Sequence, residues 1–311
     1  MENSSQNENA LSIGMIGFGE AGQAFWNGWT GDDAIETAFT ASVFDIKTAI
    51  PGPVADAKRV DYAKAGVAGV DDAPAAVAGA SVVFSLVTAD QALTAAKSAA
   101  PGLRPGTLYF DCNSCAPQTK QAASKIIDAA GGRYIDVAVM APVEPKRHKV
   151  PLLVSGPAVA DALAVMTALG MAPQDAGDKV GAASSNKLVR SIMVKGMEAL
   201  AVECFLAGRM LGVEENVLES LEKSNPGYNW REKIAYNFDR VMVHGKRRAS
   251  EMRESAAMIE ALGLPARMAT ATADWEQHIG DLALAPGEPD VGQRADIVLA
   301  ALSPKPADAA E

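Results

Sequence analysis

Two patterns of apolar and polar residues follow one another along the chain. Over roughly the first 180 positions, short apolar runs bounded by turn residues alternate with alanine-rich stretches whose apolar residues recur at helical spacing. Strands are predicted at 12–18, 40–46, 81–87, 107–112, 134–139 and 150–156, and helices at 23–29, 90–100 and 118–130. Strands that alternate with helices in this way predict an α/β fold, a doubly wound parallel sheet with helical crossovers.

From about Val180 onward the strand pattern stops and only helical periodicity remains. Helices are predicted at 184–211, 214–224, 229–242, 247–262 and 265–279. This change predicts a sheet domain over 11–179 followed by an all-α domain over 180–302. The polar ends, 1–10 and 303–311, are predicted to be disordered tails.

Composition excludes several classes of partner. The chain has 311 residues and a net charge of −10, which repels nucleic-acid phosphates. No apolar run is long enough to span a bilayer, and the start, MENSSQNENA, is polar where a secretion signal is basic and then apolar, so we expect a cytoplasmic protein without membrane contact. Only three cysteines occur; Cys112 and Cys115 form a C-x-x-C pair, but no second pair or neighbouring histidine completes a metal site. We expect no metal.

The turn GFGEAG carries the strongest chemical signal. Its glycines have the spacing G-x-G-x-x-G, directly after a predicted strand and before a predicted helix, and Asp45 ends the next strand. Together these features are the dinucleotide-binding fingerprint, in which the acidic residue accepts hydrogen bonds from the adenosine ribose. Asp45 would repel a 2′-phosphate, so the pattern predicts NAD in preference to NADP. The predicted cofactor-binding residues are Gly17, Phe18, Gly19, Glu20, Ala21 and Gly22, with Asp45, Val87 and Thr88.

Lys187 stands out in the helical half. The segment GAASSNKLVRSIMVKGMEAL offers Ser184 or Ser185 as a helix cap and places Lys187 in the first turn. The positive end of the helix dipole disfavours an ammonium there, which suits a lysine that accepts a proton near neutral pH. The alternative interpretation is an ordinary solvated lysine near a helix start.

Four segments resemble the β-hydroxyacid dehydrogenases, a family that includes 3-hydroxyisobutyrate and 6-phosphogluconate dehydrogenases. They are the glycine turn, the segment DCNSCAP, the segment from Gly181 to Lys187, whose spacing matches the family's catalytic lysine motif, and the predicted helix SEMRESAAMIEALGLP. The C-terminal half resembles a little-characterised branch with a domain of unknown function. The resemblance covers nearly the whole chain and implies an N-terminal Rossmann domain and a helical C-terminal domain. It also implies three catalytic residues: Lys187 as the catalytic lysine, with Asn113 and Ser114 near nicotinamide and substrate, where they hold the substrate hydroxyl and the carboxamide. Asn113 is thereby also a predicted cofactor-binding residue.

The substrate loop departs from the family pattern. Where relatives have D-A-P-V-S-G-G, this chain reads DVAVMAP, so a serine hydroxyl and glycine amides are replaced by Met140, Ala141 and Pro142. A sugar phosphate is therefore not the expected substrate. We expect a larger or less polar hydroxy compound instead. Other residues predicted to contact substrate are Arg190, Ser191, Arg247 and Arg248.

We therefore expect an NAD(P)-dependent dehydrogenase that acts on the CH–OH group of a hydroxy acid or related small-molecule alcohol, with Lys187 as general acid and base. Three alternatives remain: an imine or ketone reductase of the same architecture, a decarboxylating hydroxyacid dehydrogenase, and a non-catalytic NAD(H)-binding module. Relatives commonly dimerise through their helical domains. Because the segment 184–211 has apolar residues on more than one face, a homodimer is expected.

Overall fold

The computed structural model describes residues 10–302, so the two predicted tails lie outside the described residues, apart from Ala10. Within this range the chain divides into two compact units, with the boundary after Lys187. The boundary that the sequence suggests at residue 179 remains a prediction.

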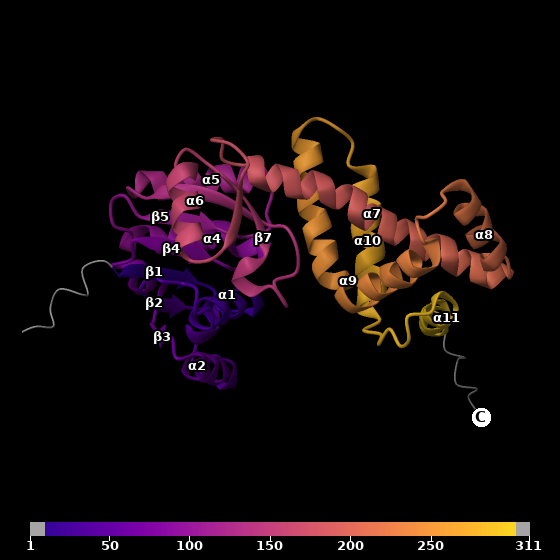
Figure 1. Ribbon diagram of the computed structural model, residues 1–311, viewed down its shortest axis with the longest axis horizontal. Coiled ribbons are helices and arrows are strands. Elements are labelled where there is room, and N and C mark those ends of the chain that lie inside the picture. The colour runs from indigo at the N-terminus through magenta and orange to yellow at the C-terminus, as the bar shows by residue number, and fades with distance from the viewer. Residues whose placement is uncertain (1–9, 303–311) are drawn as a thin grey trace, which may run out of the picture. The chain divides into compact units, whose positions relative to one another are not determined.

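The first unit is built on one eight-stranded sheet with the order β3-β2-β1-β4-β5-β6-β7-β8 (Figure 1). All neighbouring strands are parallel except β6 and β7. The predicted fold class is confirmed. The elements of this unit are β1 (Leu11–Ile16), α1 (Glu20–Thr30), β2 (Phe39–Phe44), α2 (Pro53–Ala65), β3 (Ala68–Gly69), α3 (Ala73–Val77), β4 (Val82–Ser85), α4 (Ala92–Ala99), β5 (Leu108–Asp111), α5 (Pro117–Ala129), β6 (Arg133–Val139), β7 (Pro151–Ser155), α6 (Val159–Ala168) and β8 (Ala172–Asp175).

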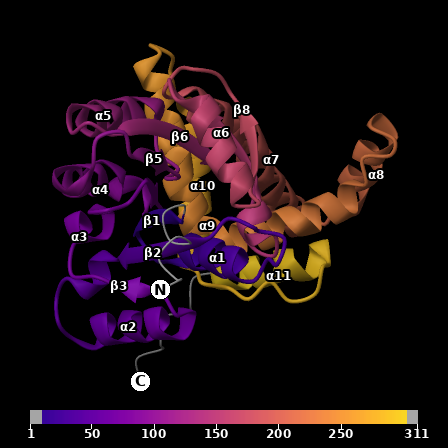
Figure 2. The same cartoon turned by 60° about the vertical axis from the view of Figure 1, so that its left-hand side comes forward.

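Alternate strand residues build a core on each face of the sheet, because successive side chains of a strand point to opposite sides. On β4, Phe84 packs with α1 and α6 residues in one core, and Val83 packs with α3, α4 and α5 residues in the other. Figure 2 shows α3, α4 and α5 stacked along one face of the sheet. Both faces are therefore covered, as a parallel sheet requires.

The antiparallel pair has a simple cause in the connection. Parallel neighbours need a crossover long enough to return the chain to the same edge, usually a helix. The segment between β6 and β7 contains only a short 3-10 turn at Arg147–Lys149, so the chain reverses and β7 runs against β6. The apolar run at 150–156 is thus a strand as predicted, but it is not parallel to its neighbour β6.

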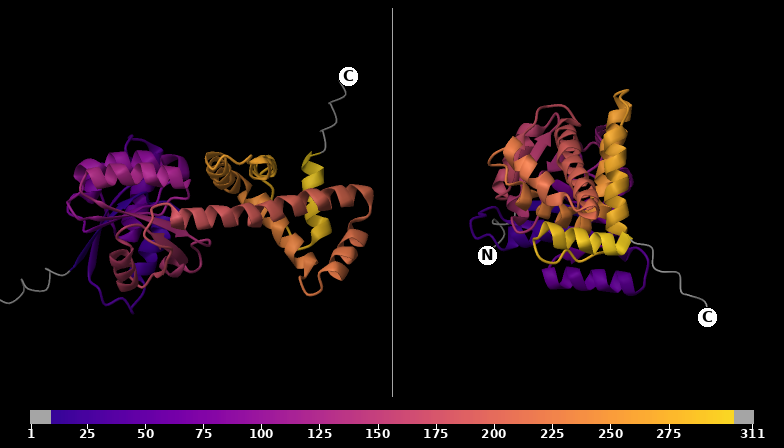
Figure 3. Two further views of the ribbon diagram at one scale, coloured as in Figure 1. Left: turned by 90° about the horizontal axis from the view of Figure 1, so that it is seen from above. Right: turned by 90° about the vertical axis from the view of Figure 1, so that its right-hand side faces the viewer.

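The second unit is helical and contains the rest of α7 (Ala182–Leu211) together with α8 (Glu214–Ser224), α9 (Trp230–Ala261), α10 (Arg267–Asp281) and α11 (Val291–Leu302). Helix α7 is one long uninterrupted helix (Figure 3). Its side chains Val202, Phe205 and Leu206 are buried in the core of this unit. No helix among residues 10–302 is long and apolar enough to cross a membrane.

The two helices predicted at 229–242 and 247–262 are one helix, α9, so that prediction was wrong. The segment between the two predicted helices contains Gly245. In the structure Gly245 lies where α9 and α10 pack together: a Cβ added there would come within 2.3 Å of the Glu276 carbonyl oxygen and 2.8 Å of Gly280 Cα. The glycine permits close helix packing and does not end the helix.

Candidate functional site

The carboxyl ends of five parallel strands bring most of the predicted residues of the first unit to one edge of the sheet. Strands β1 and β4 are neighbours in the sheet although β2 and β3 lie between them in sequence. Ligands of open α/β sheets bind at such a reversal of strand order. The loops that follow β1, β2, β4, β5 and β6 carry, in turn, Gly17–Gly22, Asp45, Val87 and Thr88, Asn113 and Ser114, and Met140–Pro142.

The three glycines of the first loop meet different surroundings. Gly17 has a φ of +91°, and a Cβ there would lie 2.4 Å from the Leu86 carbonyl oxygen. A Cβ at Gly22 would lie 2.8 Å from the Gly17 carbonyl oxygen. A Cβ at Gly19 would have no heavy atom within 4 Å outside its chain neighbours. The fold itself therefore requires glycine at 17 and 22, whereas at 19 it leaves open space.

That open space lies at the start of α1. Gly19 is the residue before the helix, and as a glycine it provides no side-chain cap to the first-turn N–H groups. Unpaired N–H groups and the helix dipole favour an anion at this point. Glu20 is exposed and Phe18 is buried. The loop fits the pyrophosphate of a dinucleotide: it offers backbone N–H donors and has room for a group where a side chain is absent.

Asp45 is held rigidly at the end of β2. One carboxylate oxygen accepts the Phe18 N–H at 2.9 Å and the other accepts the Lys47 N–H at 3.0 Å, and the side chain is buried. A carboxylate has about four acceptor positions, so two remain for further donors. Asp45 thus links the glycine turn to the end of β2, and its spare acceptors fit ribose hydroxyls.

Asn113 connects the ends of β4 and β5. Its side-chain oxygen accepts the Val87 N–H at 2.7 Å, and its side-chain nitrogen donates to Ser85 Oγ at 3.0 Å. Asn113 is buried, whereas Ser114 beside it is half-buried. Lys187 Nζ donates to Ser114 Oγ at 2.5 Å. Of the three predicted catalytic residues, two are thus in direct contact and the third is adjacent in the chain.

Helix α7 does not begin as the sequence suggested. It starts at Ala182, so Lys187 is the sixth residue and lies in the second turn, and neither Ser184 nor Ser185 precedes the helix. Two residues on neighbouring strands bind its first N–H groups instead: Ser155 Oγ accepts from Ala183 at 3.0 Å, and Asp136 Oδ2 accepts from Ser184 at 2.9 Å. These distant acceptors replace a local cap, which explains why the motif-based start was wrong.

The loop after β6 offers few donors to an anion. The Met140 N–H donates to the Pro151 carbonyl oxygen at 2.9 Å, and Pro142 has no N–H. Ala141 and Pro142 are exposed. Further along, the loop is fixed to the end of α1: His148 Nε2 lies 3.0 Å from Asp32 Oδ2, and a Cβ at Gly28 would lie 2.2 Å from His148 Nδ1. Hydrogen bonding from Lys149 lowers the pKa of Asp32 to about 2.

The four predicted substrate residues beyond Lys187 lie in the second unit. Arg190 is exposed. Ser191 accepts from Lys195 Nζ at 3.1 Å, and Arg247 pairs with Glu251 at 2.7 Å. Arg248 is buried and pairs with Glu198 and with Glu276. Three of the four thus already have partners within this unit.

Around Arg248 lies a buried charged cluster that the sequence analysis did not single out. Lys195 pairs with Glu251 at 2.8 Å, and burial lowers the pKa of Lys195. Burial also raises the pKa of Glu276 to about 7, despite the neighbouring Arg248. The available signal was the helical spacing of charges on otherwise apolar faces of 184–211 and 247–262.

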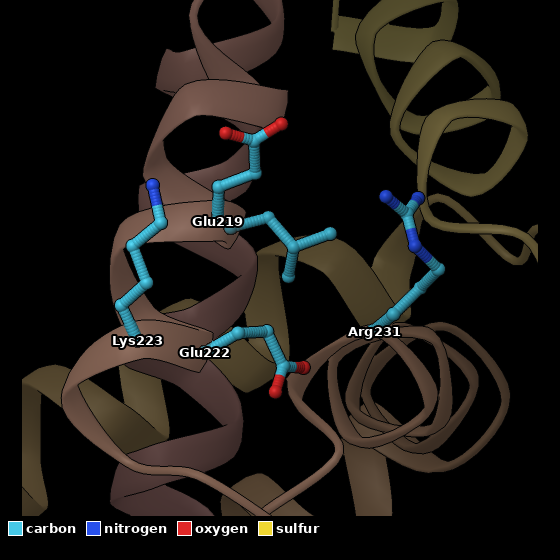
Figure 4. Close-up of a pocket in the computed structure, with 5 residues that line it drawn as sticks. Glu219, Glu222, Lys223 and Arg231 are labelled. Atoms are coloured by element: carbon cyan, nitrogen blue, oxygen red, sulfur yellow. The ribbon is translucent and has the colours of Figure 1, made fainter.

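A hollow in the second unit contains none of the predicted site residues. It is lined by Leu218, Glu219, Glu222, Lys223 and Arg231. Figure 4 shows three charged side chains projecting from α8 and Arg231 from α9. Across residues 10–302, no group of three or more histidine, cysteine, aspartate or glutamate side chains is arranged to hold a metal ion.

Two family models match the chain. The model described as the NAD binding domain of 6-phosphogluconate dehydrogenase matches residues 12–173, and one described as a domain of unknown function (DUF1932) matches residues 209–279. The first match contains the glycine turn, Asp45 and Asn113.

Several solved structures are similar over almost the whole chain. A conserved hypothetical protein from Sinorhizobium meliloti 1021 is 34% identical, with 97% of this chain and 100% of that chain covered and a TM-score of 0.76. A conserved protein of unknown function, MTH1747, described as structurally similar to 3-hydroxyacid dehydrogenases, is 27% identical, with 92% and 99% covered and a TM-score of 0.70. A 3-hydroxyisobutyrate dehydrogenase from Mycobacterium tuberculosis, solved with L-serine, shares the fold at 17% identity, with 94% and 100% covered and a TM-score of 0.71.

Proposed function

The chain belongs to the family defined by the NAD binding domain of 6-phosphogluconate dehydrogenase, and from this premise we propose that it is an NAD(P)-dependent dehydrogenase acting on the CH–OH group of a hydroxy acid or related alcohol. One observation carries the proposal: Lys187 Nζ lies 2.5 Å from Ser114 Oγ, at the sheet edge that also holds the open glycine turn. A cofactor-binding loop alone would need no lysine at this position.

The cofactor half of the proposal assigns binding to backbone groups. The first N–H groups of α1 would bind the pyrophosphate beside Gly19, and the spare acceptors of Asp45 would bind the adenosine ribose. Val87, Thr88 and Asn113 would contact the nicotinamide side. Nicotinamide, when bound, supplies the acceptor or donor of hydride. A buried carboxylate at the ribose position favours NAD over NADP, because it repels a 2′-phosphate.

In the proposed reaction, Lys187 transfers the proton. In the oxidation direction, Nζ of neutral Lys187 would accept the proton of the substrate hydroxyl, and in reduction its ammonium would return a proton to the same oxygen. Ser114 Oγ already contacts Nζ, so it would hold the substrate hydroxyl beside the lysine. Asn113, fixed by Val87 and Ser85, would hold the neighbouring loop in place.

The loop after β6 supports a substrate whose far end is less polar than a sugar phosphate. Of the three backbone positions Met140, Ala141 and Pro142, the first N–H is already used and the third does not exist. An anionic group there would meet few backbone donors. We therefore propose a branched or aryl hydroxy compound in preference to a phosphosugar acid.

We also propose that the protein forms a homodimer through α7. Besides its buried face, α7 has an exposed apolar face made of Val189, Met193, Met197 and Leu200, which lie within an arc of about 80° at 100° per residue. An uncovered apolar stripe of this length is typical of a protein–protein interface.

The free cysteines Cys112, Cys115 and Cys204 fit a reducing compartment, and we propose that the protein is located in the cytoplasm.

The test is a screen of absorbance at 340 nm with NAD and NADP over small hydroxy acids, phosphosugar acids and bulkier aryl or branched hydroxy compounds. Lys187→Met should lower turnover by about 10²-fold or more, the size of a general acid–base contribution, and leave NADH binding unchanged. Lys125→Met, at an exposed position on α5, is the matched control and should retain turnover. Equal turnover in the Lys187 and Lys125 variants would refute the catalytic assignment.

A further inference from the structure

A buried ammonium lies between two segments of the candidate site, the loop that carries Asn113 and the start of α7. Lys120, on α5, has a fully buried side chain, and its Nζ lies 2.9 Å from Asp111 Oδ1 and 3.3 Å from Asp136 Oδ1. Asp111 and Asp136 are register partners on β5 and β6, so their side chains emerge on the same face of the sheet. One cation thus joins the end of β5 to the middle of the neighbouring strand β6.

From Asp111 the contacts lead to the Asn113 loop. Its Oδ1 accepts the Asn113 N–H at 3.0 Å, and its Oδ2 accepts from Tyr134 Oη at 2.6 Å. Lys120 Nζ also donates to the Asp111 carbonyl oxygen at 2.6 Å. These bonds fix the backbone between Asp111, the last residue of β5, and Asn113. That backbone positions the Asn113 side chain against Val87.

From Asp136 the contacts lead to α7. Its Oδ2 accepts both the N–H of Ser184 at 2.9 Å and the hydroxyl of Ser184 at 3.0 Å. Ser155 Oγ donates to the same oxygen at 3.3 Å and accepts from the Ala183 N–H. Lys187 follows Ser184 by three residues, so the anchor lies one turn before the lysine that contacts Ser114.

The charges of this network explain why it needs its cation. Two carboxylates and one ammonium are buried with almost no exposure. Burial alone would lower the pKa of Lys120, but Asp111 and Asp136 outweigh it and raise that pKa, so the ammonium stays charged. Without it, two buried carboxylates would face one another on adjacent strands, and at least one would have to move toward water or bind a proton.

We propose that Lys120 is a positioning residue whose ammonium fixes Asp111 and Asp136, and through them both the Asn113 loop and the start of α7 that carries Lys187. The inference rests on the proposed function for its catalytic meaning. The positioning itself depends only on the contacts above, all of which lie in the first unit. Its test therefore needs a readout that requires neither substrate nor cofactor.

The experiment is hydrogen–deuterium exchange measured by mass spectrometry on full-length variants. Lys120→Met should raise amide exchange at least about tenfold both in peptides covering 111–116 and in those covering 182–188, because both anchors are lost, with α1 peptides unchanged. Tyr134→Phe should raise exchange in the first group only, and Ser184→Ala in the second only. Thr107→Val, which removes a buried hydrogen bond to the Ala80 carbonyl oxygen near the start of β5, is the control and should affect neither group.

A second variant covers the case in which Lys120→Met does not fold. Lys120→Met combined with Asp136→Asn removes one charge of each sign, so the site keeps its net charge and two buried carboxylates no longer face one another. It should show the same double increase. A uniform rise over the whole first unit, or a rise in one group alone, would overturn the proposal.

Catalysis supplies an independent arm. With a substrate found in the 340 nm screen, the Lys120 variants should lose turnover by about 10²-fold, as misplaced catalytic groups do, with the KM for the cofactor changed less than threefold. Unchanged turnover together with the double rise in exchange would show that the anchor does not position the catalytic groups. Absence of any substrate with the double rise would count against the proposed function but not against the anchor.

Discussion

Gly19→Ala separates cofactor binding from folding more cleanly than any other change in the glycine turn. The added Cβ would have no heavy atom within 4 Å outside its chain neighbours, and Gly19 has a φ of −82°, which alanine adopts freely. The fold should therefore accept the methyl group with a change in unfolding free energy of no more than about 0.5 kcal/mol. Alanine at this position is disfavoured only if another molecule occupies the space.

Cofactor affinity should respond very differently. A methyl group forced into a packed contact costs about 1–3 kcal/mol, and each 1.4 kcal/mol is tenfold in affinity, so NADH should bind roughly 10- to 100-fold more weakly. Gly22→Ala is the matched control, because its Cβ would lie 2.8 Å from the Gly17 carbonyl oxygen within the protein. That variant should lose about 1–3 kcal/mol of stability, or roughly 2–4 °C of melting temperature per kcal/mol in a protein of this size.

The assay is a fluorescence titration with NADH alongside thermal unfolding of both variants. Wild-type NADH affinity in Gly19→Ala would refute the assignment of the open space to the pyrophosphate. Strong destabilisation of Gly19→Ala would show instead that this glycine serves the fold. The two measurements together distinguish the reasons for which glycine occupies positions 19 and 22.

Three further predictions follow from single groups. NADPH should bind at least about tenfold more weakly than NADH, and Asp45→Ser should narrow that gap in the same titration, because the repelling carboxylate is removed. Burial raises the pKa of the Glu276 carboxyl to about 7 from its usual 4.5. Between these pH values the native state keeps a proton that the unfolded chain loses, so the free energy of unfolding falls as pH rises through 7. Urea unfolding at pH 5 and pH 8 should show that wild type loses at most about 3 kcal/mol more stability between the two pH values than Glu276→Gln does. Leu200→Glu should convert a dimer to a monomer in light scattering, whereas Lys223→Glu on α8 should not; a wild-type monomer would contradict the α7 interface.

The sequence identified those parts of the site that depend on backbone geometry. Glycine at 17 is required by a positive φ and at 22 by a close carbonyl oxygen, and such requirements leave a fixed spacing that can be read directly. The alternation of apolar runs with helical stretches likewise predicts the layers, because each strand must bury both of its faces. Local pattern and global fold agree here, which is why the fold class followed from the pattern alone.

Long-range contacts account for the predictions that were wrong. The start of α7 is set by Asp136 and Ser155, which precede it by almost fifty and about thirty residues, so a local capping motif pointed to the wrong serines. Gly245 does not break α9, because α10 packs against it and compensates for its low helix propensity. The direction of β7 depends on the length of its connection to β6. The first two of these causes lie outside any window of neighbouring residues.

Lys120 illustrates how such contacts can still leave a trace in the sequence. At helical spacing it shares the buried face of α5 with Ala123 and Ile127, where a charged residue is costly unless it is paired. A lysine on an apolar stripe therefore indicates a buried partner, although it does not name one. The aspartates within two apolar runs, at 111 and 136, are the acidic residues that the sheet topology brings beside it.

The substrate is harder to infer than the cofactor for a physical reason. The proposed pyrophosphate and ribose contacts would use backbone N–H groups and one carboxylate, so few sequences would satisfy them and the pattern is specific. The Met140 N–H of the loop after β6 is already used and Pro142 has none, so substrate recognition by this loop would depend on side-chain shape and exclusion of water. Many side chains fill an apolar space about equally well, so the loop restricts charge more strongly than identity. A substrate screen should therefore vary bulk and branching at fixed charge, because these are the properties by which we propose that the loop selects its substrate.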